Sequence, residues 1–353
     1  MKMTNPCSAV ADINWINCEG RHYSLEGYME IQNAITTKQV KRAFSRLGFS
    51  LCAILALATL FQILLTVGVA IVEELVMAPW NDFEIPDWVQ WLVIFLPIYL
   101  VGMPVGYLLM KKVPATSAEP QKLGGKQFWL YALMCMPLMY GGNVIGSLMQ
   151  ALLSGGQASS GIEILALDTS PLKVVFLVIL APIFEEFIFR KQLIDRTVCY
   201  GEKTAVLFSA LMFALFHTNI QQFFYALGLG WIFGYVYLKT CDLRYSTLLH
   251  IMVNFLGTVV APLVMSLCNL EADDSGLFGD MTGLWPMVIY GMLLISLSIA
   301  GLVVLIAYRK NFIYQPTELE LPKGNRFKVV YCNAGVIVFA LLSVAIGLML
   351  MSL

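Results

Sequence analysis

The chain has 353 residues, of which 59% are hydrophobic and 13% are charged, and its mean hydropathy is +0.75. This composition excludes an ordinary soluble domain and indicates a polytopic membrane protein. The formal net charge of −1 gives no concentrated basic face, so no nucleic-acid partner is expected.

Residues 1–46 precede the first long apolar run and mix polar with charged side chains. They hold no apolar stretch near the start that would mark a cleaved signal peptide, so we interpret them as a cytoplasmic lead-in. His22 lies here beside Arg21 and Tyr23, where a solvated surface position is expected. Residues 47–353 are predicted to form the transmembrane bundle.

Nine apolar runs approach the length of about 20 residues that a helix needs to cross a bilayer. They lie at 48–72, 88–110, 128–153, 171–194, 204–219, 222–238, 245–268, 284–308 and 329–352. Because the fifth and sixth runs are short, the predicted fold is an all-α transmembrane helical bundle with about eight or nine spans. The eight cysteines are scattered without metal-ligand spacing and are expected to be free thiols.

The segments between these runs alternate in charge. The basic segments are 111–126, 190–203, 239–244 and 309–328, and the acidic segments are 73–87, 163–168 and 271–280. Lys and Arg mark the cytoplasmic side, which predicts an N-terminus inside and, for an odd number of spans, a C-terminus outside. A compact chain without an organelle address favours a bacterial cell membrane.

Two glycine pairs at four-residue spacing favour close helix contacts. They are Gly142 with Gly146 and Gly230 with Gly234. Small residues at this spacing let membrane helices approach each other closely, although glycine is also tolerated in such helices without a special role.

Residues 181–190 place two carboxylates and a guanidinium inside an otherwise apolar run. A charge near the middle of a transmembrane helix costs about 2.5–3.5 kcal/mol, which indicates chemistry, transport or pairing. Glu186 and Arg190 are four residues apart and share a helix face, whereas Glu185 points about 100° away from Glu186. The two carboxylates are therefore predicted to have different roles, a structural ion pair for Glu186 and a functional group for Glu185.

Two polar pairs follow on later runs and contain two of the three histidines. Phe213 shares a helix face with His217, and His250 shares one with Asn254. If these side chains face the bundle interior together with Glu185, they offer a carboxylate, two imidazoles and an amide to one site. Taken singly, either histidine could instead be an interfacial residue.

This set suits hydrolysis of an amide bond. A carboxylate in a dry pocket can take a proton from water near neutral pH, and an asparagine amide can donate to a developing oxyanion. Two histidines with one glutamate also form a ligand set for Zn²⁺ with an open position for water. The sequence leaves open a metal-free mechanism and a zinc ion held by Glu185, His217 and His250.

Three motifs occur in order on successive runs: Glu185-Glu186-x-x-x-Arg190, Phe213-x-x-x-His217 and His250-x-x-x-Asn254. Together they resemble the signatures of the CAAX-protease and bacteriocin-processing family of membrane peptidases, also called the Abi family, which includes the type II CAAX prenyl endopeptidases. The resemblance covers roughly residues 171–262 and implies an intramembrane endopeptidase.

The resemblance also implies roles for the motif residues. Glu185 would activate the attacking water, His217 and His250 would help hold that water or a metal, and Asn254 would stabilise the oxyanion. Supporting roles are implied for the Glu186–Arg190 pair, which would orient the catalytic helix, and for Phe213, which would line the cavity.

The implied substrate is a membrane-associated peptide or protein, lipidated or not, such as a CAAX protein or a bacteriocin leader. The oligomeric state is not predicted. Two alternatives keep the same residues, namely a proton-coupled carrier and a non-catalytic protein for bacteriocin immunity or peptide binding.

The depth of the site poses a problem. A rise of 1.5 Å per residue puts His217 about 20 Å from the cytoplasmic side of the membrane. Glu185 and His250 fall in the cytoplasmic half, closer to that side. Either the fifth helix begins deeper than Thr204, or the site lies near mid-membrane.

Overall fold

The computed structural model describes residues 25–77, 85–116, 119–155, 170–268, 281–317 and 319–351. Every regular element in these ranges is a helix, which confirms the predicted all-α fold. The six cysteines in these ranges are free, as expected. His22 and the acidic segments 163–168 and 271–280 lie outside the described residues.

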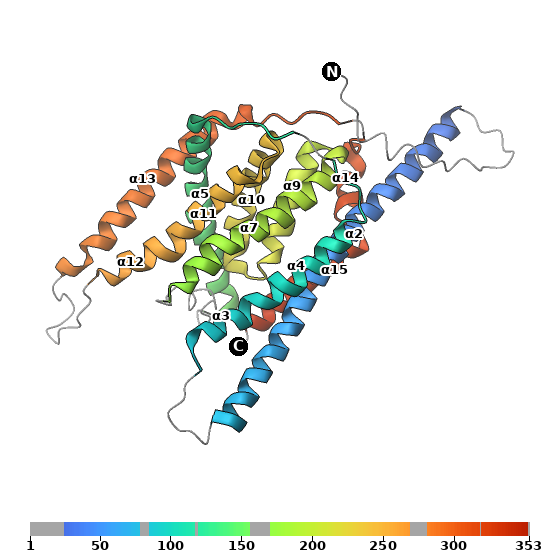
Figure 1. Ribbon diagram of the computed structural model, residues 1–353. Coiled ribbons are helices and arrows are strands. Elements are labelled where there is room, and N and C mark those ends of the chain that lie inside the picture. Colours follow the sequence, from blue (N-terminus) through green and yellow to red (C-terminus); the bar gives the residue numbers. More distant parts are fainter. Residues whose placement is uncertain are drawn as a thin grey trace.

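The helices run side by side in a bundle (Figure 1). In chain order they are α2 (Leu25–Val72), η1 (Glu73–Met77), α3 (Asp87–Leu96), η2 (Pro97–Gly102), α4 (Met103–Met110), α5 (Gly125–Ser154), η3 (Val174–Leu180), α7 (Ala181–Glu186), η4 (Phe187–Ile194), α8 (Asp195–Thr197), η5 (Val198–Tyr200), α9 (Glu202–Phe216), α10 (Ile220–Thr240), α11 (Leu243–Phe255), η6 (Leu256–Val260), α12 (Ala261–Ser266), η7 (Met281–Leu284), α13 (Trp285–Tyr308), η8 (Arg309–Asn311), α14 (Lys323–Val330) and α15 (Ala334–Met351).

Within the described ranges, five helical segments are long and apolar enough to cross a membrane, or six if α14 and α15, bent by 57°, form one span. The five are Thr37–Leu75, Trp88–Met110, Gly125–Ser154, Leu243–Ser266 and Trp285–Asn311. Each of the nine predicted runs contains a helix, but the count of eight or nine spans is not confirmed. Charge and length explain part of the difference, because the run 171–194 carries Glu185, Glu186 and Arg190 and α9 has only 15 residues.

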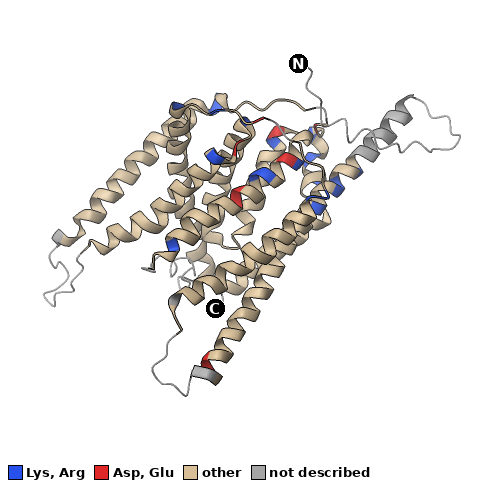
Figure 2. Ribbon diagram, viewed as in Figure 1, with Lys and Arg blue, Asp and Glu red and all other residues tan. Residues whose placement is uncertain are grey.

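The basic connecting segments meet at one end of the bundle, called here the basic end. Figure 2 shows Lys and Arg gathered there. Backbone hydrogen bonds join the segments, from Thr116 N to Asp195 O at 2.6 Å and from Gln121 N to Thr240 O at 2.6 Å. Lys173 is an exception, because it caps the start of η3, at the other end of that span. The basic connecting segments of the sequence therefore share one end of the bundle, and Glu73 of the acidic segment 73–87 lies away from it.

The predicted close helix contacts are confirmed around α10, which packs between α5 and α9. A Cβ atom on Gly142 would overlap the backbone of Tyr225, and one on Gly146 would overlap the backbone of Gln221. On the other face of α10, Gly230 lies against Ala210 of α9. Glycine thus lets α5 and α9 fix the position of α10, which lines the site.

Candidate active site

Glu186 and Arg190 form a fully buried pair on consecutive turns of α7 and η4. Arg190 Nε donates to Glu186 Oε2 at 3.1 Å, and both side chains have 0% exposure. Arg190 Nη1 also donates to Ser209 Oγ on α9 at 2.9 Å, and this hydroxyl donates to Phe189 O at 2.6 Å. The guanidinium lies 4.6 Å from the ring centroid of Phe213. The first motif is thereby tied to α9, where the second motif lies.

His250 of α11 lies between the two carboxylates of the first motif. Its Nδ1 is 3.1 Å from Glu186 Oε1, and its Nε2 is 3.8 Å from Glu185 Oε2. A carboxylate held in its ionised form by Arg190 only accepts hydrogen bonds, so Nδ1 is the donor. The ring of Phe233 stacks on the imidazole at 5.2 Å between centroids. Glu186 therefore fixes the tautomer of His250 and turns Nε2 toward Glu185.

His217 follows the last residue of α9, where the chain reverses into α10. Thr218 has a φ of 51°, and the side chain of Asn219 accepts a hydrogen bond from Gln221 N at 2.8 Å as the N-cap of α10. His217 Nδ1 donates to the carbonyl oxygen of Phe213 at 2.8 Å, because a carbonyl oxygen only accepts. As in His250, Nδ1 is used for this hydrogen bond, and Nε2 is the ring nitrogen left for another partner.

The ring of Phe213 brings the two imidazoles together. It makes edge contacts with His217 at 4.7 Å and with His250 at 5.6 Å between centroids. Glu185, whose side chain is 18% exposed, interacts electrostatically with His217 and faces His250. The ring of Phe213 thus contacts both imidazoles, and Glu185 interacts with both histidines, so the three side chains from three helices are neighbours.

Asn254 lies one turn beyond His250 and bonds to a neighbouring helix. Its Nδ2 donates to the carbonyl oxygen of Leu177 in η3 at 2.8 Å. An amide nitrogen carries two hydrogens, so one remains for a second acceptor. In this structure, Asn254 joins α11 to the span that carries Glu185.

Two tyrosines near Glu185 were not predicted from the sequence. Tyr99 and Tyr225 both interact electrostatically with its carboxylate, and Tyr99 stacks on Phe184 at 4.5 Å between ring centroids. The chain has 15 tyrosines, and these two lie on runs without a charged motif. No signal in the sequence therefore separates them from other aromatic residues.

The site contains residue types that can bind a metal ion, but in the described ranges their side chains are not arranged to hold one. No group of three or more His, Cys, Asp or Glu side chains there is placed to hold a metal ion. Glu185, His217 and His250 remain the residues whose chemistry suits Zn²⁺, and zinc stays a prediction.

The site lies deep in the bundle. His217 comes 15 residues after Glu202, the first residue of α9, and His250 comes eight residues after the N-cap Asp242. At 1.5 Å per residue these are about 22 Å and 12 Å from the basic end, which bracket the middle of a hydrocarbon core about 30 Å thick. α9 begins at Glu202, two residues before Thr204, and a site near mid-membrane fits these helix bounds.

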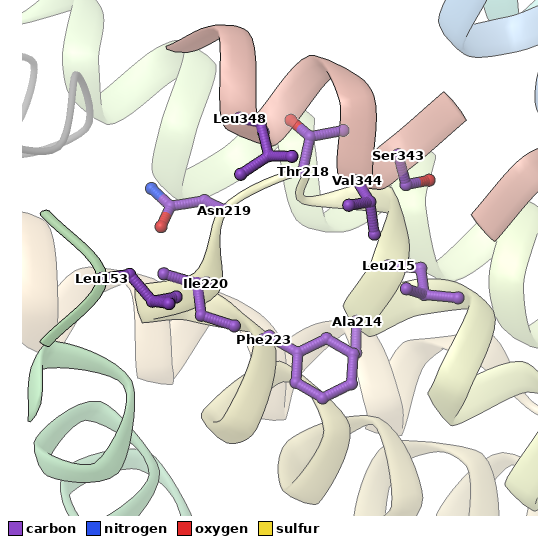
Figure 3. A pocket seen from close by; sticks show the side chains of 11 residues that line it. Leu153, Ala214, Leu215, Thr218, Asn219, Ile220, Phe223, Ser343, Val344 and Leu348 are labelled. Carbon is purple, nitrogen blue, oxygen red and sulfur yellow. The ribbon is translucent and has the colours of Figure 1, made fainter. Parts of the chain in front are cut away.

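An apolar cavity of about 170 Å³ lies at the turn of Thr218 and Asn219 that follows His217 (Figure 3). In this view Thr218 lies along the upper edge with Val344 and Leu348 of α15, Ala214 lies on the right, and Phe223 of α10 lies below. The cavity can take an apolar group at the turn between α9 and α10, although His217 itself does not line it.

Residues 168–256, which hold all three motifs, match the family model described as type II CAAX prenyl endopeptidase Rce1-like. The chain is 25% identical over 165 residues to the putative membrane peptidase YdiL of Bacillus subtilis, a match over 44% of this chain and 66% of that protein. It is 27% identical over 216 residues to the membrane-embedded CAAX protease MroQ of Staphylococcus aureus, a match over 57% of this chain and 84% of that protein. No solved structure matches the chain.

The matched part of the chain therefore defines a class, a helical membrane protein with an Rce1-like segment. The resemblance to the CAAX-type membrane peptidases is confirmed, and it supports a membrane peptidase. The chain spans slightly less than two thirds of YdiL, so its substrate and detailed chemistry are treated below as proposals.

Proposed function

We propose that this protein is an intramembrane endopeptidase that hydrolyses a peptide bond with water activated by Glu185. One observation carries the proposal. Both histidines use Nδ1 for a fixed hydrogen bond, His217 to Phe213 O and His250 to Glu186. In each ring the Nε2 atom is therefore left to act together with Glu185. A carboxylate with two lone-pair nitrogens can hold and deprotonate one water molecule.

The proposed reaction needs no covalent intermediate with the enzyme. Glu185 takes a proton from water as its oxygen attacks the peptide carbon, and the second amide hydrogen of Asn254 stabilises the oxyanion. The C–N bond then breaks, and Glu185 passes the proton to the departing amine. Reagents that modify serine or cysteine are expected to leave cleavage intact.

Glu186 has a different role in this proposal. The negative charge of its carboxylate is neutralised by Arg190, and the carboxylate accepts a hydrogen bond from Nδ1 of His250. It therefore acts as a positioning residue that orients the imidazole.

The proposed substrate is a membrane-associated peptide or protein, lipidated or not. MroQ is named a CAAX protease, which supports a CAAX-type or peptide-processing substrate for this chain as well. The cavity at the turn of Thr218 and Asn219 could take an apolar side chain or lipid group of the substrate. We place the protein in a bacterial cell membrane with its basic end in the cytoplasm, by the positive-inside rule.

The proposal can be tested by comparing the membrane peptides of cells with and without an intact Glu185. The same comparison identifies candidate substrates. Three bacterial strains would express the unchanged protein, Glu185→Gln or Glu73→Gln. Glu73 is the control position, because it is exposed on η1 and lies far along the chain from the motifs. We expect specific peptides to disappear with Glu185→Gln and to persist with Glu73→Gln at equal protein levels. Persistence of all peptides with Glu185→Gln would favour the carrier or the non-catalytic binding protein instead.

A chelator separates the two forms of the mechanism. Because no three donors in the described ranges are placed to hold a metal ion, we expect cleavage by the purified protein to survive chelation. Loss of cleavage that Zn²⁺ restores would assign Glu185, His217 and His250 as ligands.

A further inference from the structure

We propose that a cavity at the basic end binds the phosphate group of an anionic phospholipid. The cavity has a volume of about 280 Å³ and lies where the first turns of α5 meet the last turns of α10 and α13 (Figure 1). Its polar lining includes Lys122, Tyr131, Tyr235, Lys239, Thr240 and Tyr308. None of the candidate catalytic residues lines it, so this inference is independent of the proposed peptidase function.

Of the two lysines that line the cavity, Lys239 has its charge compensated by a carboxylate and Lys122 does not. Lys239 Nζ donates to Glu202 Oε2 at 2.9 Å and lies 5.6 Å from the ring centroid of Tyr235. Lys122 is exposed and forms no ion pair within the described ranges. The cavity therefore carries a net positive charge that no protein carboxylate in those ranges neutralises.

The chain next to the lining residues adds more positive charge. Lys126 precedes the lining residue Gln127, and Arg309 and Lys310 follow Tyr308 directly. No ion pair with a described residue is formed by these three side chains either. A cluster of this kind attracts anionic headgroups, with a contribution of about 1 kcal/mol per Lys or Arg near the surface.

Tyrosine hydroxyls supply neutral donors beside this charge. The hydroxyl of Tyr235 is already used, because it donates to Asn311 O at 2.9 Å and accepts from Ile313 N at 3.2 Å. Tyr131 and Tyr308 also line the cavity and interact with each other electrostatically. Their O–H groups can donate to phosphate oxygens.

The position of the cavity selects a lipid over a free anion. Three helix ends define it, so it lies at the level where the bundle leaves the hydrocarbon core. The lipid-facing side of α13 is apolar, with Ile295, Ile299 and Val303 exposed by 61%, 59% and 61%, and by helix geometry it lies on the opposite face of α13 from Tyr308. A phosphate carried by a lipid would be held at this level, with its acyl chains in the hydrocarbon core beside the bundle.

The test uses the full chain purified in detergent, with thermal denaturation followed during titration. The probes are phosphatidylglycerol, phosphatidylcholine and inorganic phosphate. We expect phosphatidylglycerol to raise the midpoint temperature of denaturation until binding saturates. The other two probes should leave this temperature nearly unchanged. Lys122→Gln should weaken the apparent affinity for phosphatidylglycerol roughly fivefold, from the contribution of one charge.

Lys112→Gln is the matched control, because Lys112 is an exposed lysine just after α4 that does not line the cavity. It should bind phosphatidylglycerol like the unchanged chain, and so should Glu185→Gln. Equal effects of the two lipids, or equal losses in Lys122→Gln and Lys112→Gln, would overturn the proposal. Stabilisation by inorganic phosphate equal to that by phosphatidylglycerol would assign the cavity to a free anion.

Discussion

Glu185 and Glu186 are adjacent in the sequence but have different surroundings. Glu186 has 0% side-chain exposure between Arg190 and His250, whereas the side chain of Glu185 is 18% exposed. The angle of about 100° between successive helical residues predicted this difference from the sequence alone. The hydrogen bond from His250 to Glu186 joins residues 64 apart, so it depends on how α11 packs against α7 and could not be predicted from spacing.

The hydroxyl of Ser209 tests how the buried pair is held. Ser209→Ala removes the acceptor of Arg190 Nη1 and leaves a buried cationic group with one partner fewer. We expect a loss of about 1–3 kcal/mol in the free energy of unfolding, measured by denaturation in detergent. Ser296→Ala is the control, because the hydroxyl of Ser296 bonds to Met292 O one turn earlier on an exposed face. Equal stability of the two variants would show that Ser209 does not support Arg190.

At the scale of elements, the site depends on how α10 is held between α5 and α9. The glycine spacing in α5 predicted a close contact, but its partner could not be read from the sequence. Contact with the backbone of α10 depends on the turn at Thr218, where φ is 51°. The same turn ends α9 at His217, which explains why a short apolar run carries a site residue.

Gly146→Ala tests this contact within α5. Its new Cβ atom would overlap the backbone of Gln221, so we expect a loss of about 1–3 kcal/mol in stability and a displaced α10. Gly141→Ala is the matched control on the same helix, since a Cβ atom at Gly141 would have no neighbouring atom within 4 Å among the described residues. It should be neutral or stabilising by up to about 1 kcal/mol, because alanine favours helix over glycine. A neutral Gly146→Ala would mean that α5 and α10 are not in close contact.

Over the whole molecule, the basic connecting segments lie at one end of the bundle, as the sequence pattern predicted. The number of spans was harder to predict. Length and hydropathy identify helices that face lipid, such as α13, but the helices of the site carry charges or are short because their polar groups face protein.

Cysteine labelling on intact cells tests the orientation of the bundle. Lys112→Cys lies at the basic end, and Glu73→Cys lies where α2 reaches the other end; both positions are exposed. We expect a membrane-impermeant thiol reagent to label Glu73→Cys from outside and Lys112→Cys only after permeabilisation. The unchanged chain gives the background from its native cysteines. The reverse labelling pattern would contradict a cytoplasmic basic end.

The most direct measurement of the central claim is kcat/KM for Glu185→Gln, His217→Gln and the double variant, on a substrate found by the peptide comparison. If both groups act on one water, each single change should lower kcat/KM roughly 100- to 10,000-fold. The double variant should then be no slower than the worse single variant. Losses that multiply in the double variant, at unchanged thermal stability, would show that Glu185 and His217 act independently and would contradict a shared hydrolytic water.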